Sequence, residues 1–393
     1  MKRIEFVFFD AGGGHRSAAT ALALAIQEKG LPWQVEMMNL QEILDALDIL
    51  RKFTRIRIQD FYNWMLKSGW TLGSQQLMRV LQAFIRLYHQ ATVRRLENHW
   101  RESAPDMVVS FIPHFNRALF ESYRNVFPGR PFVTILTDIA DYPPHFWMER
   151  QAQYFVCGSE RAVAQAGAMG HPQERIFHAS GMILHPRFYA PQTADRAAER
   201  VCLNLLPDLP TALVLFGGQG NRVMLEIAER LDNSKLDLQL IFICGKNQKL
   251  VQALRQRKPR IRSYIEGFTS EIPYYMHLSD FFIGKPGPGS LSEALAKQLP
   301  VIVECNAWTL PQERYNSQWV IERNVGLSLK SFREIVPAVE RLLDPRTFAS
   351  YRHNAGLHPN RAVFEIPAFL EQIFQREESA RGNGTDAPLH ASI

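Results

Sequence analysis

One stretch, residues 281–303, constrains the fold more than any other part of the chain. It runs from the apolar residues 281–283 through a loop rich in glycine and proline, then a helical stretch beginning at Ser290, and ends in the apolar residues 301–303. This order predicts a strand–loop–helix–strand unit. Glycines let backbone N–H groups approach an anion, and the first turn of the next helix offers unpaired N–H groups. We therefore predict a phosphate-binding loop, made by Gly287, Pro288, Gly289 and Ser290.

An ordinary strand-to-helix turn is the alternative for this stretch. Glu293 follows Ser290 by three residues, the spacing of a capping box, in which the two side chains cap the helix start between them. The same carboxylate is equally suited to bind a hydroxyl group of a ligand. The three glycines and two prolines exceed what a plain turn needs, which favours the phosphate-binding interpretation.

A second glycine loop lies near the start of the chain. Gly12, Gly13 and Gly14 separate the apolar residues 4–9 from an alanine-rich stretch, residues 17–28. The dinucleotide pattern G-x-G-x-x-G is missing, so this strand–loop–helix unit is not predicted to bind NAD or FAD. His15 closes the loop, where the positive end of a helix lowers a histidine pKa and keeps the imidazole able to accept a proton. A structural histidine is the alternative.

Strands alternate with helices along the rest of the chain, which predicts an α/β protein with two doubly wound, Rossmann-like domains facing a cleft. The 393 residues suffice for two cores. We place the first domain at residues 1–190, the second at 191–376 and a disordered tail at 377–393, with the linker in 181–191. The predicted strands are residues 4–9, 35–38, 107–112, 132–136, 154–157, 213–216, 238–244, 281–283 and 301–303. The predicted helices are residues 17–28, 118–125, 160–169, 223–231, 290–296 and 365–375, the last one crossing back to the first domain.

Residues 51–101 differ from the rest in charge and aromatic content. They hold ten Lys or Arg residues, two acids and eight aromatic residues. A basic amphipathic helix with aromatic side chains binds an anionic lipid surface. An ordinary helix pair with a solvated basic face is the alternative, while nucleic-acid binding is not predicted because no recognisable binding motif is present.

Other sequence features limit the location of the chain. Its net charge of +6 suits phosphate ligands, anionic lipids or nucleic acid. Cys157, Cys202, Cys244 and Cys305 lack metal-ligand spacing, and no run approaches the roughly 18–20 apolar residues that span a bilayer. The first residues do not read as a signal peptide. We expect a cytoplasmic protein that associates peripherally with a membrane.

Several motifs in order resemble those of the monogalactosyldiacylglycerol synthase-like glycosyltransferases, which are related to the lipid-linked N-acetylglucosaminyltransferase of peptidoglycan synthesis. The motifs are residues 10–18, Thr137-Asp138, residues 244–247, residues 266–268 and residues 281–296. The resemblance covers residues 4 to 345. It implies the GT-B fold and the transfer of a hexose from a UDP-sugar to a membrane lipid such as diacylglycerol.

The resemblance also implies roles for individual residues. Glu293 would bind the ribose, Phe268 would lie against the uracil, and Gln312 with Glu313 would read the sugar hydroxyls. His15 would be the base or a phosphate contact, and Asp138 either a competing base or the group that orients His15. From the residues alone, a helix start after Pro311 is the alternative for Gln312 and Glu313.

A departing diphosphate gathers negative charge, so backbone N–H groups stabilise it most in the transition state. The glycine loops place these groups, with Gly14, Gly218, Gln219 and Gly220 joining residues 287–290. No D-x-D occurs, so we predict neither a metal site nor a cofactor beyond the donor substrate. Lys285 or Lys246 would add a positive charge.

Two departures from the family pattern leave sugar and acceptor open. Residues 143–147 read Pro-Pro-His-Phe-Trp where the family has His-Pro followed by Thr-Trp-Phe, and His185 replaces a family arginine, with Arg187 nearby. We predict an inverting, metal-independent hexosyltransferase with a UDP-hexose donor and a lipid acceptor. The alternatives are a soluble or polyprenyl acceptor, a UDP-sugar epimerase, or a membrane-binding UDP-sugar sensor. The oligomeric state stays open.

Overall fold

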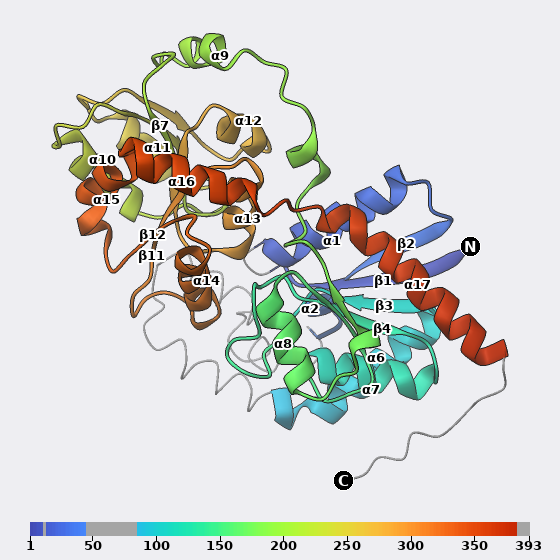
Figure 1. The fold of residues 1–393 in the computed structure, drawn as a ribbon. Coiled ribbons are helices and arrows are strands. Elements are labelled where there is room, and N and C mark those ends of the chain that lie inside the picture. The colour runs from blue at the N-terminus through green and yellow to red at the C-terminus, as the bar shows by residue number, and fades with distance from the viewer. Residues whose placement is uncertain (11–12, 45–84, 383–393) are drawn as a thin grey trace.

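Two α/β domains make up the protein, each built on a six-stranded parallel sheet (Figure 1). The computed structural model describes residues 1–10, 13–44 and 85–382. The strands of the first sheet, in spatial order, are β2 (Trp33–Asn39), β1 (Lys2–Phe8), β3 (Met107–Ser110), β4 (Phe132–Ile135), β5 (Tyr154–Cys157) and β6 (Ile176–His178). Those of the second are β12 (Gly326–Leu329), β11 (Val301–Glu304), β10 (Phe281–Gly284), β7 (Thr211–Leu215), β8 (Gln239–Ile243) and β9 (Ser263–Glu266).

Helices cover both faces of each sheet. Those of the first domain are α1 (Gly14–Glu28), α2 (Leu40–Leu44), α6 (His89–Ser103), α7 (Asn116–Val126) and α8 (Glu160–Ala168), with 3₁₀ turns η1 (Gln173–Arg175) and η2 (Pro186–Tyr189). Those that follow are α9 (Arg196–Cys202), α10 (Val223–Asp232), α11 (Gln248–Arg255), α12 (Ile272–His277), α13 (Pro288–Ala296), α14 (Pro311–Glu322), η3 (Phe332–Glu334), α15 (Ile335–Leu343), α16 (Pro345–Gly356) and α17 (Ala362–Gly382).

Alternation along the strands divides each core into two layers. In β1, Ile4 and Phe6 pack against α1 and α17, whereas Val7 points to the opposite face and packs against α6 and α7. In the second domain, Val214 of β7 packs toward α10 and α15, and Leu213 packs toward α12 and α13. These strands are buried on both faces, which is why they read as continuous apolar runs in the sequence.

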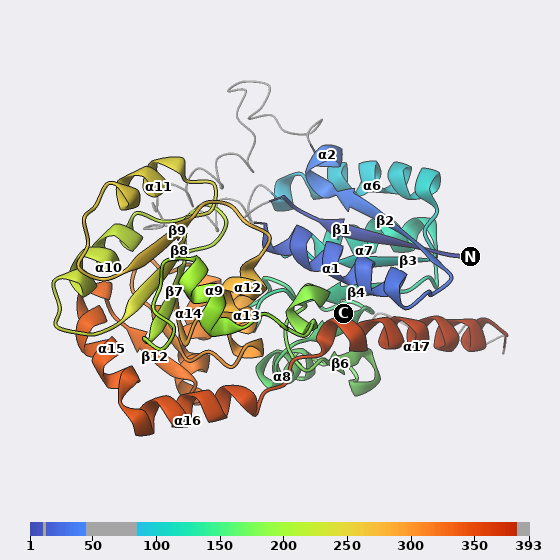
Figure 2. The same cartoon turned by 90° about the horizontal axis from the view of Figure 1, so that it is seen from above.

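The last helix returns to the first domain, as the sequence predicted. α17 lies along the first sheet beside α1 (Figure 2), and its residues Ile366, Leu370 and Ile373 belong to the same apolar cluster as β1. The chain therefore passes between the domains twice. The two crossings are joined by hydrogen bonds, from Asn360 Nδ2 to Met182 O at 2.8 Å and from Arg361 N to Ser180 Oγ at 2.7 Å.

α17 is longer than predicted and changes two predicted boundaries. Its apolar residues complete the first domain, so that domain is not limited to residues 1–190. The predicted tail also starts too early, because the helix continues to Gly382. Tyr154 donates to Glu377 at 2.9 Å, and Lys2 pairs with Glu378, so the second half of the helix is tied to the first domain. Residues 383–393 lie outside the described residues.

Every predicted strand is present within a few residues of its predicted position, and the order of elements in both domains is confirmed. Three short strands, β6, β9 and β12, were not predicted from the sequence. The proposed membrane-binding segment falls largely on residues 45–84, outside the described residues. In its described part, α6 buries Val93, Leu96 and Trp100 and exposes Arg94 and Arg95.

The strand order reverses once in each sheet. β1 is followed by β2 on one side and β3 on the other, and β7 is followed by β8 on one side and β10 on the other. Ligands of doubly wound sheets bind at such points, beyond the carboxyl ends of the strands. The predicted glycine loops and His15 follow β1, β7 and β10, and therefore lie at both points.

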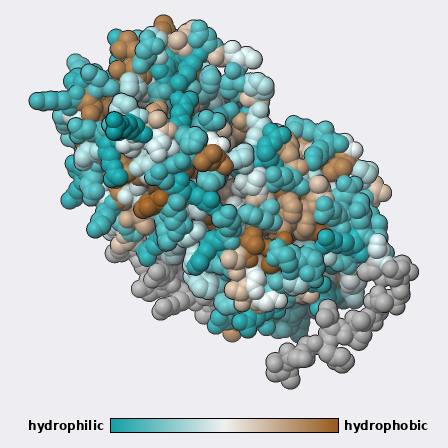
Figure 3. Space-filling model, viewed as in Figure 1, coloured by the Kyte–Doolittle hydropathy of each residue, from teal (hydrophilic) through white to brown (hydrophobic). Residues whose placement is uncertain are grey.

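The outer surface shows no large apolar area on the face seen in Figure 1: apolar side chains form small, separate patches there (Figure 3). Among the helices that the structure describes, none is long and apolar enough to cross a membrane.

Candidate functional site

His15 stands at the carboxyl end of β1, at the start of α1. Gly13 takes the left-handed backbone conformation, with φ of 84°, that turns the chain into the helix. Nδ1 of His15 lies 3.0 Å from Thr137 Oγ1, and its ring centroid lies 5.8 Å from that of Trp147. Burial lowers the pKa of His15 to about 4, and a hydrogen bond from the imidazole to the Phe111 backbone opposes this with a smaller effect. The predicted direction holds, but burial is the larger cause rather than the helix end.

Asp138 follows β4 and is almost fully buried. Its Oδ2 accepts a hydrogen bond from Trp147 Nε1 at 2.9 Å. Burial raises the pKa of Asp138 to about 7, whereas the Trp147 bond lowers it. The sequence left open whether Asp138 orients His15. In the structure the hydrogen bonds of the described residues join Nδ1 of His15 to Thr137 and Oδ2 of Asp138 to Trp147, so the role of Asp138 toward His15 stays a prediction.

The glycine loop after β7 is shaped by the neighbouring loop after β8. Gly220 and Gly245 have positive φ angles of 63° and 57°, and a Cβ on Gly245 would lie 2.3 Å from Gly218 O. Lys246 N donates to that same carbonyl at 2.9 Å. This contact leaves no room for a side chain at Gly245. By contrast, a Cβ on Gly218 would meet no described atom within 4 Å, so the outer edge of the loop faces open space.

The loop after β10 leads into α13, which begins at Pro288 rather than at Ser290. Gly287 is the N-cap, and no described side chain caps it. The capping-box interpretation is therefore wrong: Ser290 lies inside the helix and donates to Gly287 O at 3.4 Å. Asn316 of α14 fixes the loop by donating to Pro286 O at 2.7 Å. The uncapped N–H groups of the first turn remain available to a ligand.

Glu293 lies in the second turn of α13 and is half-buried. Burial raises the pKa of its carboxyl to about 7, and no described side chain donates a hydrogen bond to it. A carboxylate of this kind accepts hydroxyl donors well. The structure therefore leaves Glu293 open for the predicted contact with a ligand hydroxyl.

Lys285 and Glu313 form an ion pair that connects β10 with α14. Lys285 Nζ lies 2.7 Å from Glu313 Oε1, and Glu313 is only 7% exposed. Lys285 Cε would lie 3.7 Å from a Cβ on Gly217 and 3.2 Å from one on Gly287, so the lysine stands between the two glycine loops. α14 does begin at Pro311, and its first turn carries Gln312 and Glu313.

The two domains meet at these residues. Glu313 raises and Lys285 lowers the pKa of Asp138, which places all three charges close to one another across the domain interface. The structure thus brings together His15, Asp138, Lys285, Glu313 and the glycine loops.

Phe268 and Lys246 lie beside each other, and the Lys246 backbone contacts the glycine loop after β7. Phe268 follows β9 and is 63% exposed, with Lys246 Nζ 5.2 Å from its ring centroid. An exposed aromatic ring beside the loop after β8 is suited to stacking on a planar ligand.

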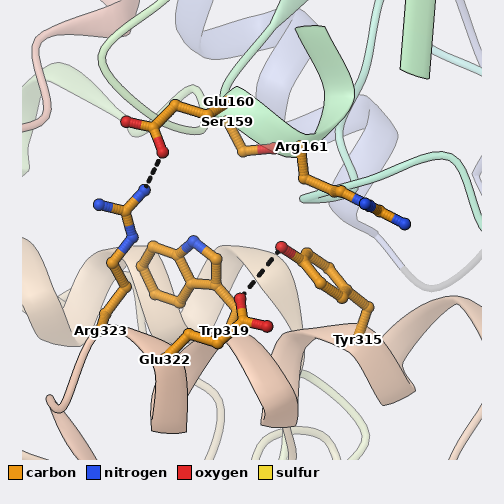
Figure 4. Close-up of a pocket in the computed structure, with 7 residues that line it drawn as sticks. All are labelled: Ser159, Glu160, Arg161, Tyr315, Trp319, Glu322 and Arg323. Atoms are coloured by element: carbon orange, nitrogen blue, oxygen red, sulfur yellow. Dashed lines mark hydrogen bonds and ion pairs between the residues drawn. The ribbon is translucent and has the colours of Figure 1, made fainter. Parts of the chain in front are cut away.

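A pocket of about 240 Å³ lies where Glu160 and Arg161 of α8 face Trp319 of α14 and Arg323, the residue that follows α14 (Figure 4). Arg323 pairs with Glu160 at 2.8 Å, and the rings of Tyr142 and Tyr315 lie 5.5 Å apart. Glu160 pairs with Arg323, and Arg161 donates to the Tyr142 hydroxyl at 2.6 Å, so we interpret this place as a contact between the domains.

Replacing Gly289 with alanine tests the loop after β10. A Cβ there would meet no described atom within 4 Å, and φ is not positive. We therefore expect the free energy of unfolding to stay unchanged or to rise by up to about 1 kcal/mol. The added methyl group would crowd an anion at the helix start, weakening donor binding about tenfold. Thermal unfolding and ligand titration measure both effects. Gly167→Ala in α8, which is equally open, is the control. Unchanged donor binding in Gly289→Ala would contradict the predicted cradle.

Three residues of the site were missed as functional positions. Trp147 was noted only as a departure from the family pattern, Thr137 only as part of a motif, and Asp141 not at all. The signal for Trp147 was its place shortly after β4, at the carboxyl edge of the sheet.

Comparisons with known proteins identify related sequences. Residues 211–325 match the glycosyltransferase family 28 C-terminal domain. The chain is 27% identical to the probable monogalactosyldiacylglycerol synthase 2 of Oryza sativa subsp. japonica over 391 residues, covering 95% of this chain and 81% of the relative. The predicted resemblance is confirmed.

Solved structures show the same fold. MurG of Acinetobacter baumannii superposes with a TM-score of 0.63 at 14% identity, covering 95% of this chain and all of MurG. An S. aureus MnaA–UDP co-structure gives a TM-score of 0.60 at 16% identity and covers both chains fully. The predicted GT-B architecture, two Rossmann-like domains, is confirmed.

Proposed function

We propose that this chain is a glycosyltransferase that moves a hexose from a UDP-sugar to the hydroxyl group of a membrane lipid such as diacylglycerol. The observation that carries the proposal is the meeting of two groups across the domain interface. His15 and Asp138 come from the first domain, and Lys285, Glu313 and the glycine loops from the second. The similarity to plant monogalactosyldiacylglycerol synthases favours a lipid acceptor, and the UDP in one structural neighbour favours a uridine nucleotide.

The second domain would hold the donor. The diphosphate would lie against the N–H groups of the loops after β7 and β10, with Lys285 between them. Phe268 would lie against the uracil, Glu293 would accept the ribose hydroxyls, and Gln312 and Glu313 would bind the sugar. Preorganised N–H groups and a fixed cation stabilise the charge that builds on the departing diphosphate.

The first domain would activate the acceptor hydroxyl through His15, helped by Asp138. When His15 donates its Nδ1–H to Thr137 Oγ1, Nε2 keeps a lone pair that accepts the acceptor's proton. The acceptor oxygen then forms a bond to the anomeric carbon while the bond from that carbon to the phosphate oxygen breaks. UDP leaves with the electron pair and the product keeps the sugar with inverted configuration.

A metal ion is not needed in this scheme. Lys285 supplies the positive charge that a metal clamp supplies elsewhere, and the sequence holds no D-x-D. We further propose that the protein works at the cytoplasmic surface of a membrane, held by its basic face. In the described part of residues 51–101 that face includes the exposed Arg94 and Arg95.

Product analysis tests the proposal. Purified protein is incubated with liposomes of anionic lipid and diacylglycerol and a panel of UDP-hexoses, with and without EDTA, and the lipids are analysed by mass spectrometry. We expect one hexosyl lipid in equal yield under both conditions. If the product formed only without EDTA, metal independence would be contradicted, but the transfer reaction would not.

Other products would point to the rival activities. A UDP-sugar consumed without acceptor would indicate an epimerase, and transfer in the absence of lipid would indicate a soluble acceptor. Binding of UDP-sugars and liposomes without turnover would indicate a sensor.

A further inference from the structure

Asp141 holds the loop that leads to Trp147. Its carboxylate is buried, with only 2% of the residue exposed, and accepts two backbone hydrogen bonds. Oδ1 accepts from Trp147 N at 2.6 Å, and Oδ2 accepts from His145 N at 3.0 Å. Gln165 of α8 fixes the other side of the residue, because its side-chain amide bonds both the N–H and the C=O of Asp141. Both of these bonds to the Asp141 carboxylate come from backbone N–H groups of its own loop. Because a charged acceptor makes strong hydrogen bonds, they hold the end of the loop in place.

The end of that loop is Trp147, which is fully buried and fixed from several directions. Asn116 donates to its carbonyl at 2.9 Å, and its ring lies beside His15. Its indole N–H is the donor to Asp138, at 2.9 Å. The bond from the Trp147 backbone N–H to Asp141 is therefore one of the contacts that place the indole at Asp138.

We propose that Asp141 is a positioning residue for the transfer reaction, acting through Trp147 to keep the Asp138 carboxylate hydrogen-bonded to the Trp147 indole. This proposal rests on the proposed function, which assigns Asp138 to the reaction. The hydrogen bonds that join Asp141, Trp147 and Asp138 do not depend on any substrate.

Two effects of Asp141 on Asp138 have opposite signs, and this makes the proposal testable. The Trp147 hydrogen bond favours the charged carboxylate and lowers the pKa of Asp138, whereas the negative charge of Asp141 itself raises it, by less. The other charged groups acting on Asp138 are Glu313, which raises its pKa, and Lys285, which lowers it, both from the second domain. His15 of α1 is neutral above about pH 4.

Removing the Asp141 charge without moving Trp147 would lower the pKa of Asp138. Removing the positioning effect would raise the pKa of Asp138, because the Trp147 hydrogen bond, the larger of the two effects, is lost. The direction of the change in Asp141→Asn therefore separates a positioning residue from a simple neighbouring charge.

The experiment follows the indole N–H resonance of Trp147 by NMR in protein labelled with ¹⁵N-tryptophan, without substrate. Trp147→Phe assigns the signal among the seven tryptophans, and Asp138→Asn identifies the titration that belongs to Asp138. We expect a midpoint near pH 7 in the unmodified protein and a midpoint at higher pH in Asp141→Asn. An unchanged or lower midpoint overturns the proposal.

Kinetics give the second readout. We expect kcat of Asp141→Asn at pH 7 to fall by about tenfold or more, since a small misplacement of a site group is costly, with the KM for the UDP-sugar nearly unchanged. Glu149→Gln is the control: this carboxylate is also partly buried, its pKa is also raised, and no described side chain donates to it. Equal losses in both variants overturn the positioning role.

Two further arms keep the outcome decisive. If Asp141→Asn does not fold, Asp141→Ser takes the place of that variant in both measurements, because the serine hydroxyl retains one acceptor for the backbone N–H groups. The NMR titration needs no turnover, so absence of hexosyl transfer in the unmodified protein would reject the proposed function while leaving the role of Asp141 to be decided by the titration.

Discussion

Replacing His15 with alanine is expected to lower kcat for hexosyl transfer by about 10²- to 10⁴-fold, the contribution of a general base. The imidazole is held by Thr137 and is neutral at physiological pH, because burial lowers its pKa to about 4. Alanine removes the proton acceptor but leaves the second domain untouched, so the Kd for UDP should stay within twofold. Transfer assays and calorimetric titration with UDP measure the two quantities.

The pH dependence of the unmodified protein distinguishes the two possible bases. A base must be deprotonated, so kcat/KM rises with pH through the pKa of the base and then levels off. With His15 as base the rise lies near pH 4, and with Asp138 as base it lies near pH 7. His178→Ala, an exposed histidine at the end of β6, is the matched control and should behave as the unmodified protein. Substantial transfer by His15→Ala would end its assignment as the base.

Lys285→Met is expected to lower kcat/KM for the UDP-sugar by about 10²- to 10³-fold, the usual loss when one preorganised charge at a reacting group is removed. The lysine stands between the two glycine loops, where the departing diphosphate would gather charge. The change also leaves the nearly buried Glu313 carboxylate without its cation, which is costly. Steady-state kinetics with thermal unfolding separates the catalytic from the structural loss.

Two companion variants make this prediction specific. In Lys285→Met/Glu313→Gln the charge balance is restored, so stability should recover while activity stays low. Lys246→Met is the control for a lysine near the donor loops, because Lys246 lies over Phe268 rather than against Glu313. If Lys246→Met lost as much activity as Lys285→Met, the assignment of the diphosphate charge to Lys285 would be wrong.

Much of the fold follows from local sequence patterns. Apolar runs located nine of the twelve described strands, because a strand buried on both faces must be apolar throughout. The strands that escaped notice are the short β6, β9 and β12. β9 is only half-buried along its whole length, so it carries no apolar run to detect.

The site was predictable only where its residues are adjacent in sequence. His15 and the loops after β7 and β10 stand next to strands that the pattern identifies. The pairing of Lys285 with Glu313 joins residues 28 positions apart, and that of Trp147 with Asp138 depends on a loop whose path Asp141 sets. The mistaken capping box has the same origin, since a spacing of three residues cannot show that the helix begins at Pro288.

The return of α17 to the first sheet has a consequence for how the chain is made. The apolar cluster that contains β1 includes Ile366, Leu370 and Ile373, which the ribosome adds only after the whole second domain. Domains usually complete in the order of synthesis. Here the second domain is complete before α17 is made, and until then the first domain lacks the helix that covers the apolar cluster on one face of its sheet. The emerging chain therefore exposes that face for most of translation, when chaperones would have most to bind.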